Sequence, residues 1–386
     1  MLLNKILDGL VRLFTSMWLT VVCLALALVL VFAGTLAQVE LGLYKAQSEY
    51  FRSFFIYWGP KGAGWRIPVF PGGYLIGGVL LINLIASQIQ RFAFTASRIG
   101  LWMVHFGLIL LLLGQLMTDL LSRESVLHLR DGETKNYSES QREAELAVTD
   151  VTDPGSDKVV AIPQEVLARQ KEIRAGDLPF TVRVKRFFPN SVVQNRPADA
   201  TEPAAATQDV GARAIVKAVP RVTEMDRRDV PSAVVEIDTP KGSLGTWLVS
   251  EFIDQPQKFT FNDRTYELAM RLRRYYKPYS IKLLNFQHDV YPGTQIPKNF
   301  SSRILLQRPA TGEKREVLIY MNNPLRYAGE TYYQSGYDPD NQGTILQVVR
   351  NPSWLTPYFS CVLVGVGLVV QFTTHLLGFA FRRRTT

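Results

Sequence analysis

The chain has 386 residues, of which 47% are hydrophobic and 20% are charged, and its formal net charge is +9. Clusters of basic residues beside apolar segments account for most of this charge, which therefore does not indicate nucleic-acid binding. The only two cysteines, Cys23 and Cys361, lie inside apolar segments towards opposite membrane faces, which argues against a disulfide between them. The polar part of the chain has no thiol chemistry of its own.

Four apolar segments are candidates for membrane-spanning helices, which need ~20 residues each. They cover residues 13–36, 73–87, 99–119 and 354–380. The first is longer than the ~7–15 apolar residues of a secretory signal, so we expect an uncleaved anchor. The second is the shortest and contains Asn83, a residue type that usually hydrogen-bonds a neighbouring spanning helix.

Basic residues in the short flanking segments predict the orientation. Lys5 and Arg12 precede the first span, Arg91 and Arg98 lie between the second and third, and arginines 382–384 follow the fourth. Positive flanks stay in the cytoplasm. We therefore predict a multi-pass protein of the inner (cytoplasmic) membrane with both termini in the cytoplasm and the polar block outside, in the periplasm of a bacterium.

The loop at residues 39–70 also falls outside in this topology. Its four basic residues count mildly against the positive-inside rule, but three separate basic clusters outweigh them. The loop is rich in tyrosine, phenylalanine and tryptophan, which settle at the membrane interface. We expect it to form a helix lying in that interface.

The polar block changes to short runs of alternating hydrophobicity, which predict β-strands. We therefore expect an N-terminal membrane region at 1–120, a β-rich extracytoplasmic domain at 121–353, sandwich-like or barrel-like, and a C-terminal span with a basic tail at 354–386. The predicted strands are 180–186, 232–237, 280–284, 303–307, 316–320 and 344–349.

Two other segments of the block stand out, and neither points to catalysis. Residues 164–175 predict its one clear helix, and residues 190–212, rich in proline and alanine, predict a flexible excursion. The block contains no nucleophile motif, phosphate-binding glycine loop or zinc-ligand spacing. Its two histidines, His128 and His288, are interpreted as ordinary strand or loop residues, and the block as a binding or docking domain.

Two membrane segments each contain a histidine, a rare residue in spanning helices. His105 lies seven residues after Arg98, and His375 lies seven residues before Arg382. Seven helical residues rise ~10 Å, so antiparallel spans would hold both rings at the same depth. Histidine is a common axial ligand of haem iron, and a porphyrin between helices would suit the glycines at 100, 107 and 114.

Simpler roles for the two histidines remain open. His105 can hydrogen-bond Asn83 or a backbone carbonyl inside the bundle. His375, nearer the chain end, can extend towards water beside the arginines.

Several short strings, taken together with their order along the chain, resemble the ResB (also CcsB) family of cytochrome c biogenesis proteins. The most informative is Arg98-Ile-Gly-Leu-Trp-Met-Val-His105-Phe-Gly-Leu, which lies in the third span. The resemblance covers nearly the whole chain, including the order of three spans, exported domain and final span. The other matching strings are residues 67–73, 81–84, 291–294, 297–301, 321–329, 332–335 and 348–352.

The resemblance implies a component of cytochrome c biogenesis of the System II type. Such a component works with a multi-span ResC or CcsA-type partner, handles haem b as a transported substrate and meets apocytochrome c outside the membrane. The partner has a tryptophan-rich loop, whereas the six tryptophans of this chain are scattered, so the partner must be a separate protein. The family takes one membrane haem ligand from each protein, and His105 matches the one from ResB.

The resemblance makes His375 a weaker candidate, in a supporting role at the haem site or in none. It also implies a subunit of a holocytochrome c synthase, a lyase-type complex, without a complete active site of its own. Two alternatives remain: a scaffold that stabilises the partner without touching haem, and a membrane-anchored receptor whose β domain binds an unrelated exported ligand.

Overall fold

The structure is a computed structural model that describes residues 2–60, 65–90, 95, 98–197, 201–224, 227–294 and 297–382, with the backbone alone at 2–4, 297, 381 and 382. Lys61, Arg91 and the arginines at 383 and 384, which entered the predicted orientation, lie outside the described residues. The chain forms two compact units. The membrane unit comprises residues 1–123, 223–225 and 351–386, and the β unit comprises residues 124–222 and 226–350.

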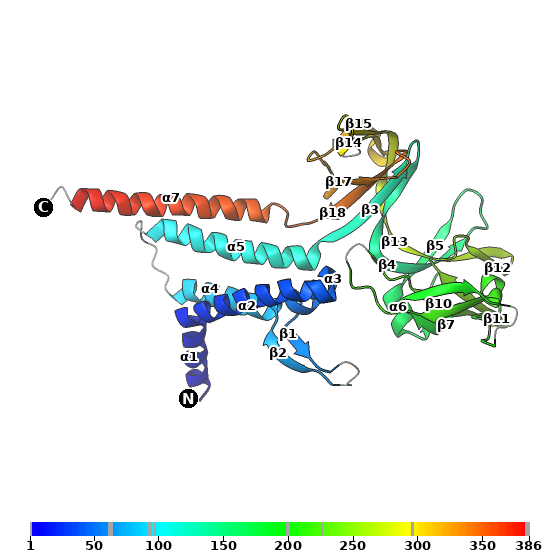
Figure 1. The fold of residues 1–386 in the computed structure, drawn as a ribbon, viewed down its shortest axis with the longest axis horizontal. Coiled ribbons are helices and arrows are strands. Elements are labelled where there is room, and N and C mark those ends of the chain that lie inside the picture. The colour runs from blue at the N-terminus through cyan, green and yellow to red at the C-terminus, as the bar shows by residue number, and fades with distance from the viewer. Residues whose placement is uncertain are drawn as a thin grey trace. The chain divides into compact units, whose positions relative to one another are not determined.

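Four helices of the membrane unit are long and apolar enough to cross a bilayer, which confirms the predicted fold class (Figure 1). They are α2 (Met17–Leu41), α4 (Gly73–Gln90), α5 (Ile99–Leu121) and α7 (Thr356–Arg382). Most of their large apolar side chains are exposed on the protein surface, an arrangement suited to lipid rather than water.

The first predicted span divides into two helices. The amphipathic α1 (Leu2–Phe14) ends in a turn at Thr15, whose hydroxyl donates to the Val11 carbonyl at 2.7 Å, and α2 begins at Met17. Figure 1 shows α1 directed away from the axis of α2. The predicted span starts at residue 13, inside α1, and therefore includes the break, which falls at the polar residues Thr15 and Ser16.

Helices α5 and α7 pack closely, and the glycines of α5 make this possible. A Cβ atom built on Gly100 would lie 2.6 Å from the Gln371 nitrogen and the Gly367 oxygen. One built on Gly107 would lie 2.6 Å from Val364 Cγ2. The glycines spaced by seven therefore face α7 and permit direct backbone contact.

The loop predicted at residues 39–70 differs from an interfacial helix. Among its described residues beyond α2, the helical ones form α3 (Leu43–Ala46) and the following π-helical turn η1 (Gln47–Phe51), and a hairpin follows, with strands β1 (Phe55–Trp58) and β2 (Ile67–Pro71). Two prolines in β2, at 68 and 71, oppose a helix there. At the end of η1, the Phe51 ring packs on Gly34 of α2 instead of facing lipid.

The β unit is built mainly on a ten-stranded and a four-stranded sheet, and all six predicted strand segments are confirmed. The four-stranded sheet runs β11 (Gly242–Ser250), β10 (Ser232–Thr239), β7 (Thr181–Phe188), β6 (Glu172–Ile173). The main path of the larger sheet runs β15 (Glu313–Tyr320), β14 (Pro297–Arg308), β13 (Arg264–Val290), β4 (Thr134–Asp150), β3 (Arg123–Arg130), β18 (Gly343–Arg350), β17 (Glu330–Tyr337), β16 (Leu325–Tyr327). Two strands pair beside this path: β12 (Gln257–Phe261) with β13, and β5 (Lys158–Pro163) with β4.

Two hydrophobic cores share the long strand β13. Its first part contributes Leu268 and Met270 to a core between the two sheets. Its last part contributes Ile281 and Leu283 to a second core with β3, β14 and β18. Between these parts the strand is rich in basic residues, which pair with acidic side chains of β4 and β17.

Two predictions for the β unit are wrong. The helix expected at 164–175 is too long: α6 covers only Gln164–Arg169, because Ile173 beyond it is buried in β6 and pairs with Val182 of β7. The expected excursion at 190–212 contains strand β8 (Ser191–Asn195), which pairs with β9 (Ala214–Ala218), and the 3₁₀ helix η3 (Asp209–Arg213). Its Ala206 serves packing, because it is buried in a small third core to which Ala214 of β9 also belongs. Residues 198–200 lie outside the described residues.

Candidate functional site

A cavity of about 400 Å³ lies among α2, α4 and α5, beside His105. At its centre Asn83 is 1% exposed and is fully hydrogen-bonded. Its amide nitrogen donates to the Phe14 and Ser16 carbonyls at 2.8 and 3.1 Å, and its oxygen accepts from Thr20 at 2.6 Å. Asn83 therefore ties α4 to the start of α2 and is not the partner of His105. The cavity is lined by Met17, Thr20, Val21, Asn83, Leu84, Ser87, Gln88, Arg98, Leu101, Trp102 and His105.

The His105 ring is held in a single tautomer by its own helix. Its Nδ1 lies 2.8 Å from the carbonyl oxygen of Leu101. A carbonyl can only accept, so Nδ1 carries the proton and the neutral ring keeps a lone pair on Nε2. This backbone bond, one of the simpler roles considered from sequence, is compatible with metal ligation, because ligating histidines commonly donate their other N–H to a carbonyl.

His375 lies on α7 and does not line the cavity beside His105. Its Nε2 accepts a hydrogen bond from the Gln371 amide at 2.7 Å. The Gln371 oxygen in turn accepts from the Leu101 N–H at 3.0 Å, in the first turn of α5. His105 thus bonds the Leu101 carbonyl directly, whereas His375 is linked to the Leu101 N–H only through Gln371. The structure does not bring the two rings together on the cavity beside His105.

A second cavity of the membrane unit, about 750 Å³, lies between α4 and α5 near Asp119. Its lining is mainly apolar, with Gly77 and Gly78 on α4 leaving space. Asp119 accepts from Arg52 Nε at 2.8 Å and from the Tyr74 hydroxyl. Sequence reasoning missed this cluster, although an acidic residue at the end of an apolar span is itself a signal of a polar partner.

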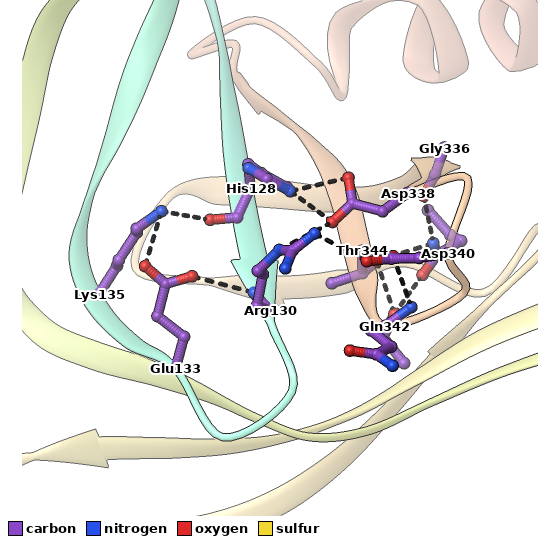
Figure 2. Close-up of polar contacts among 11 residues, drawn as sticks. His128, Arg130, Glu133, Lys135, Gly336, Asp338, Asp340, Gln342 and Thr344 are labelled. Atoms are coloured by element: carbon purple, nitrogen blue, oxygen red, sulfur yellow. Dashed lines mark hydrogen bonds and ion pairs between the residues drawn. The ribbon is translucent and has the colours of Figure 1, made fainter. Parts of the chain in front are cut away.

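In the β unit, both histidines contact the turn between β17 and β18. His128 Nε2 lies 2.9 Å from both carboxylate oxygens of Asp338, as Figure 2 shows. His288 Nδ1 lies 3.0 Å from Asn341 Oδ1. Across the described part of the chain, no group of three or more histidine, cysteine, aspartate or glutamate residues could hold a metal ion. These contacts fasten a hairpin turn.

The chain is similar to known proteins in two comparisons. Residues 242–345, from β11 to β18, match the model of the ResB-like family. Over 300 residues, or 76% of the chain, it is 23% identical to Protein NrfI of Wolinella succinogenes, and the match covers 29% of that protein. The chain thus spans under a third of the length of this curated relative. Together the matches agree with the resemblance of the sequence strings to the ResB family and identify residues 242–345 as a ResB-like segment.

Proposed function

We propose that the chain is a cytochrome c biogenesis component that acts with a ResC/CcsA-type partner. In this proposal the two proteins carry haem b across the membrane and position haem and apocytochrome c for covalent thioether attachment. The match of residues 242–345 to the ResB-like family supports the general role. The similarity to NrfI over three quarters of the chain points in the same direction.

The observation that carries the haem-handling role is the state of His105. Its proton is held on Nδ1 by the Leu101 carbonyl, and the ring borders an open space within a bundle of apolar helices. A volume of about 400 Å³ falls within the range of ligand pockets, ~300–1,000 Å³. The lone pair on Nε2 would bind the iron from one side, and a histidine of the partner would bind it from the other.

The role of this chain in the attachment step is positioning. Thioether formation requires reduced cysteines beside the haem vinyl groups, and residues 124–350 contain no cysteine. Apocytochrome c would supply the thiols, and the β unit would hold the polypeptide in place outside the membrane. The orientation with both termini in the cytoplasm is part of this proposal.

Replacement of His105 tests the proposal. In the complex with its partner, His105→Ala is expected to lose most bound haem and cytochrome c output, whereas His375→Ala retains both. Haem is measured by the absorption spectrum of the purified complex, and assembly by the yield of partner per chain. Normal haem content and output in a fully assembled His105→Ala complex would refute the role of His105.

A further inference from the structure

The β unit contains a cavity of about 820 Å³ that the proposed haem site does not use. Its floor is the outward face of β4 and β13, where Ala147 and Ala269 form a cross-strand pair. Their small side chains leave room above the sheet. One wall is the segment after β11, which contains Glu251 and Asp254.

The lining is acidic on a chain whose overall charge is positive. Two arginines also line the cavity, but each forms an ion pair with a carboxylate: Arg271 Nε lies 3.1 Å from Glu145, and Arg274 Nε lies 2.9 Å from Glu139. Among the described residues no lysine lines it, although Lys258 Nζ lies 3.0 Å from the lining Glu267, and the lining carboxylates outnumber the lining cations. The lining carboxylates are Glu139, Asp157, Glu251, Asp254 and Glu267.

Glu251 distinguishes this cavity from an ordinary acidic surface. Its side chain is only 9% exposed, and its Oε2 lies 2.5 Å from Arg228 Nη1. Its other oxygen, Oε1, is buried and has no hydrogen-bond partner among the described residues. Burial raises the pKa of Glu251, although Arg228 opposes this shift. A buried carboxylate oxygen without a donor is unfavourable, and a donor from a ligand would relieve it.

We propose that this cavity binds cationic side chains of a basic polypeptide segment, with one ammonium or guanidinium group directed at Glu251. This assignment rests on the proposed function. It adds that the β unit would recognise basic side chains of the polypeptide that it holds. The carboxylates come from β4, β13, the segment after β11 and the residue that precedes β5, so they suit several cations spaced along one chain. Exposed Asp157 and Asp254 would attract the segment, and the buried carboxylate would retain it.

Binding of a labelled lysine–glycine peptide to the full chain in neutral-lipid nanodiscs tests this assignment by fluorescence anisotropy. We expect Glu251→Gln to weaken binding ~10-fold or more, and Asp254→Asn, at the exposed rim, to weaken it ~3-fold at low salt. Glu316→Gln, which alters an exposed carboxylate on β15 outside this cavity, is the matched control and should bind like the wild type. A serine–glycine peptide should not bind.

The proposal would be overturned if Glu251→Gln and Asp254→Asn both bound the lysine peptide as tightly as the wild type. It would also be overturned if spermine bound with the same Glu251 dependence while the peptide did not, because the site would then recognise a small amine. Peptide binding requires no haem, so His105→Ala should bind like the wild type. The peptide assay therefore tests this site independently of the haem role proposed for His105.

Discussion

Two polar residues near one membrane cavity have different physical roles. Asn83 satisfies its amide through three hydrogen bonds, to the last residue of α1, to the turn that follows and to α2, so it is a structural residue. His105 makes one backbone bond and keeps the Nε2 lone pair. The sequence placed both in apolar segments, but only their hydrogen bonds distinguish the structural residue from the candidate ligand.

In the β unit, Glu330 is the centre of a buried polar network at the edge of the second core. Its Oε2 accepts from Lys277 at 2.5 Å, Tyr279 at 2.9 Å and Tyr332 at 3.0 Å. Burial opposes ionisation, but the hydrogen bond and charge of Lys277 and the two hydroxyls outweigh it, so the pKa of Glu330 is lowered. Burial also raises the pKa of both tyrosines, which remain neutral donors.

This network predicts a dependence of stability on pH. Because the folded pKa of Glu330 lies below the ordinary value of 4.5, its contribution is complete above that value and is lost as pH falls below it. Glu330→Gln should therefore flatten this acid-side decline and, by leaving Lys277 buried without its counter-charge, cost ~3 kcal/mol at neutral pH.

Thermal unfolding across a pH series measures this effect. Glu316→Gln is the control, because its pair with Arg303 spans 3.8 Å with both side chains more than half exposed. Such an exposed pair contributes less than ~1 kcal/mol. Equal losses in the two variants would contradict the assignment of the network.

At the scale of elements, the contact between α5 and α7 depends on glycine backbone. Gly100→Ala places a methyl group 2.6 Å from backbone atoms of Gln371 and Gly367, neither of which can rotate away. We expect it to lower the thermal midpoint of the detergent-solubilised chain by several degrees. Gly77→Ala on α4 is the matched control, because no atom lies within 4 Å of its Cβ. A midpoint for Gly100→Ala equal to that of Gly77→Ala would exclude close packing here.

Element type was predictable where a local pattern decides it. The spans follow from apolar length, and the six strand segments follow from alternating hydrophobicity. The errors occurred where contacts override local preference. Ile173 leaves the expected helix because the first core accepts its side chain, and Ala206 of the expected excursion becomes a buried packing residue.

At the scale of the whole molecule, the two cores of the β unit are coupled through β4 and β13. Leu268→Ala in one core and Leu283→Ala in the other should each cost ~2–5 kcal/mol, because both leucines are fully buried. We expect both variants to lower the midpoint of one shared transition, followed by circular dichroism of the full chain. Two separate transitions, each sensitive to only one variant, would show that the cores unfold independently.

The proposed orientation is testable in cells with a chain whose two native cysteines are replaced by alanine. Thr311→Cys, in an exposed turn of the β unit, should react with a membrane-impermeant maleimide on intact spheroplasts. Asp8→Cys, exposed on α1, should react only after lysis. The reverse labelling pattern would invert the topology.

The amino-acid sequence alone predicts the fold class, the four apolar spans, the β-rich character of residues 121–353, the ResB resemblance and His105 as the first candidate haem ligand. These depend on hydrophobicity, periodicity and short strings, which are local properties. The tertiary structure adds the hydrogen bond that holds the His105 proton on Nδ1, and it places Glu251 beside Arg228 at a cavity formed on β4 and β13. Such sites depend on helix rotation and strand register, which join residues far apart along the chain, and local patterns do not specify those pairings.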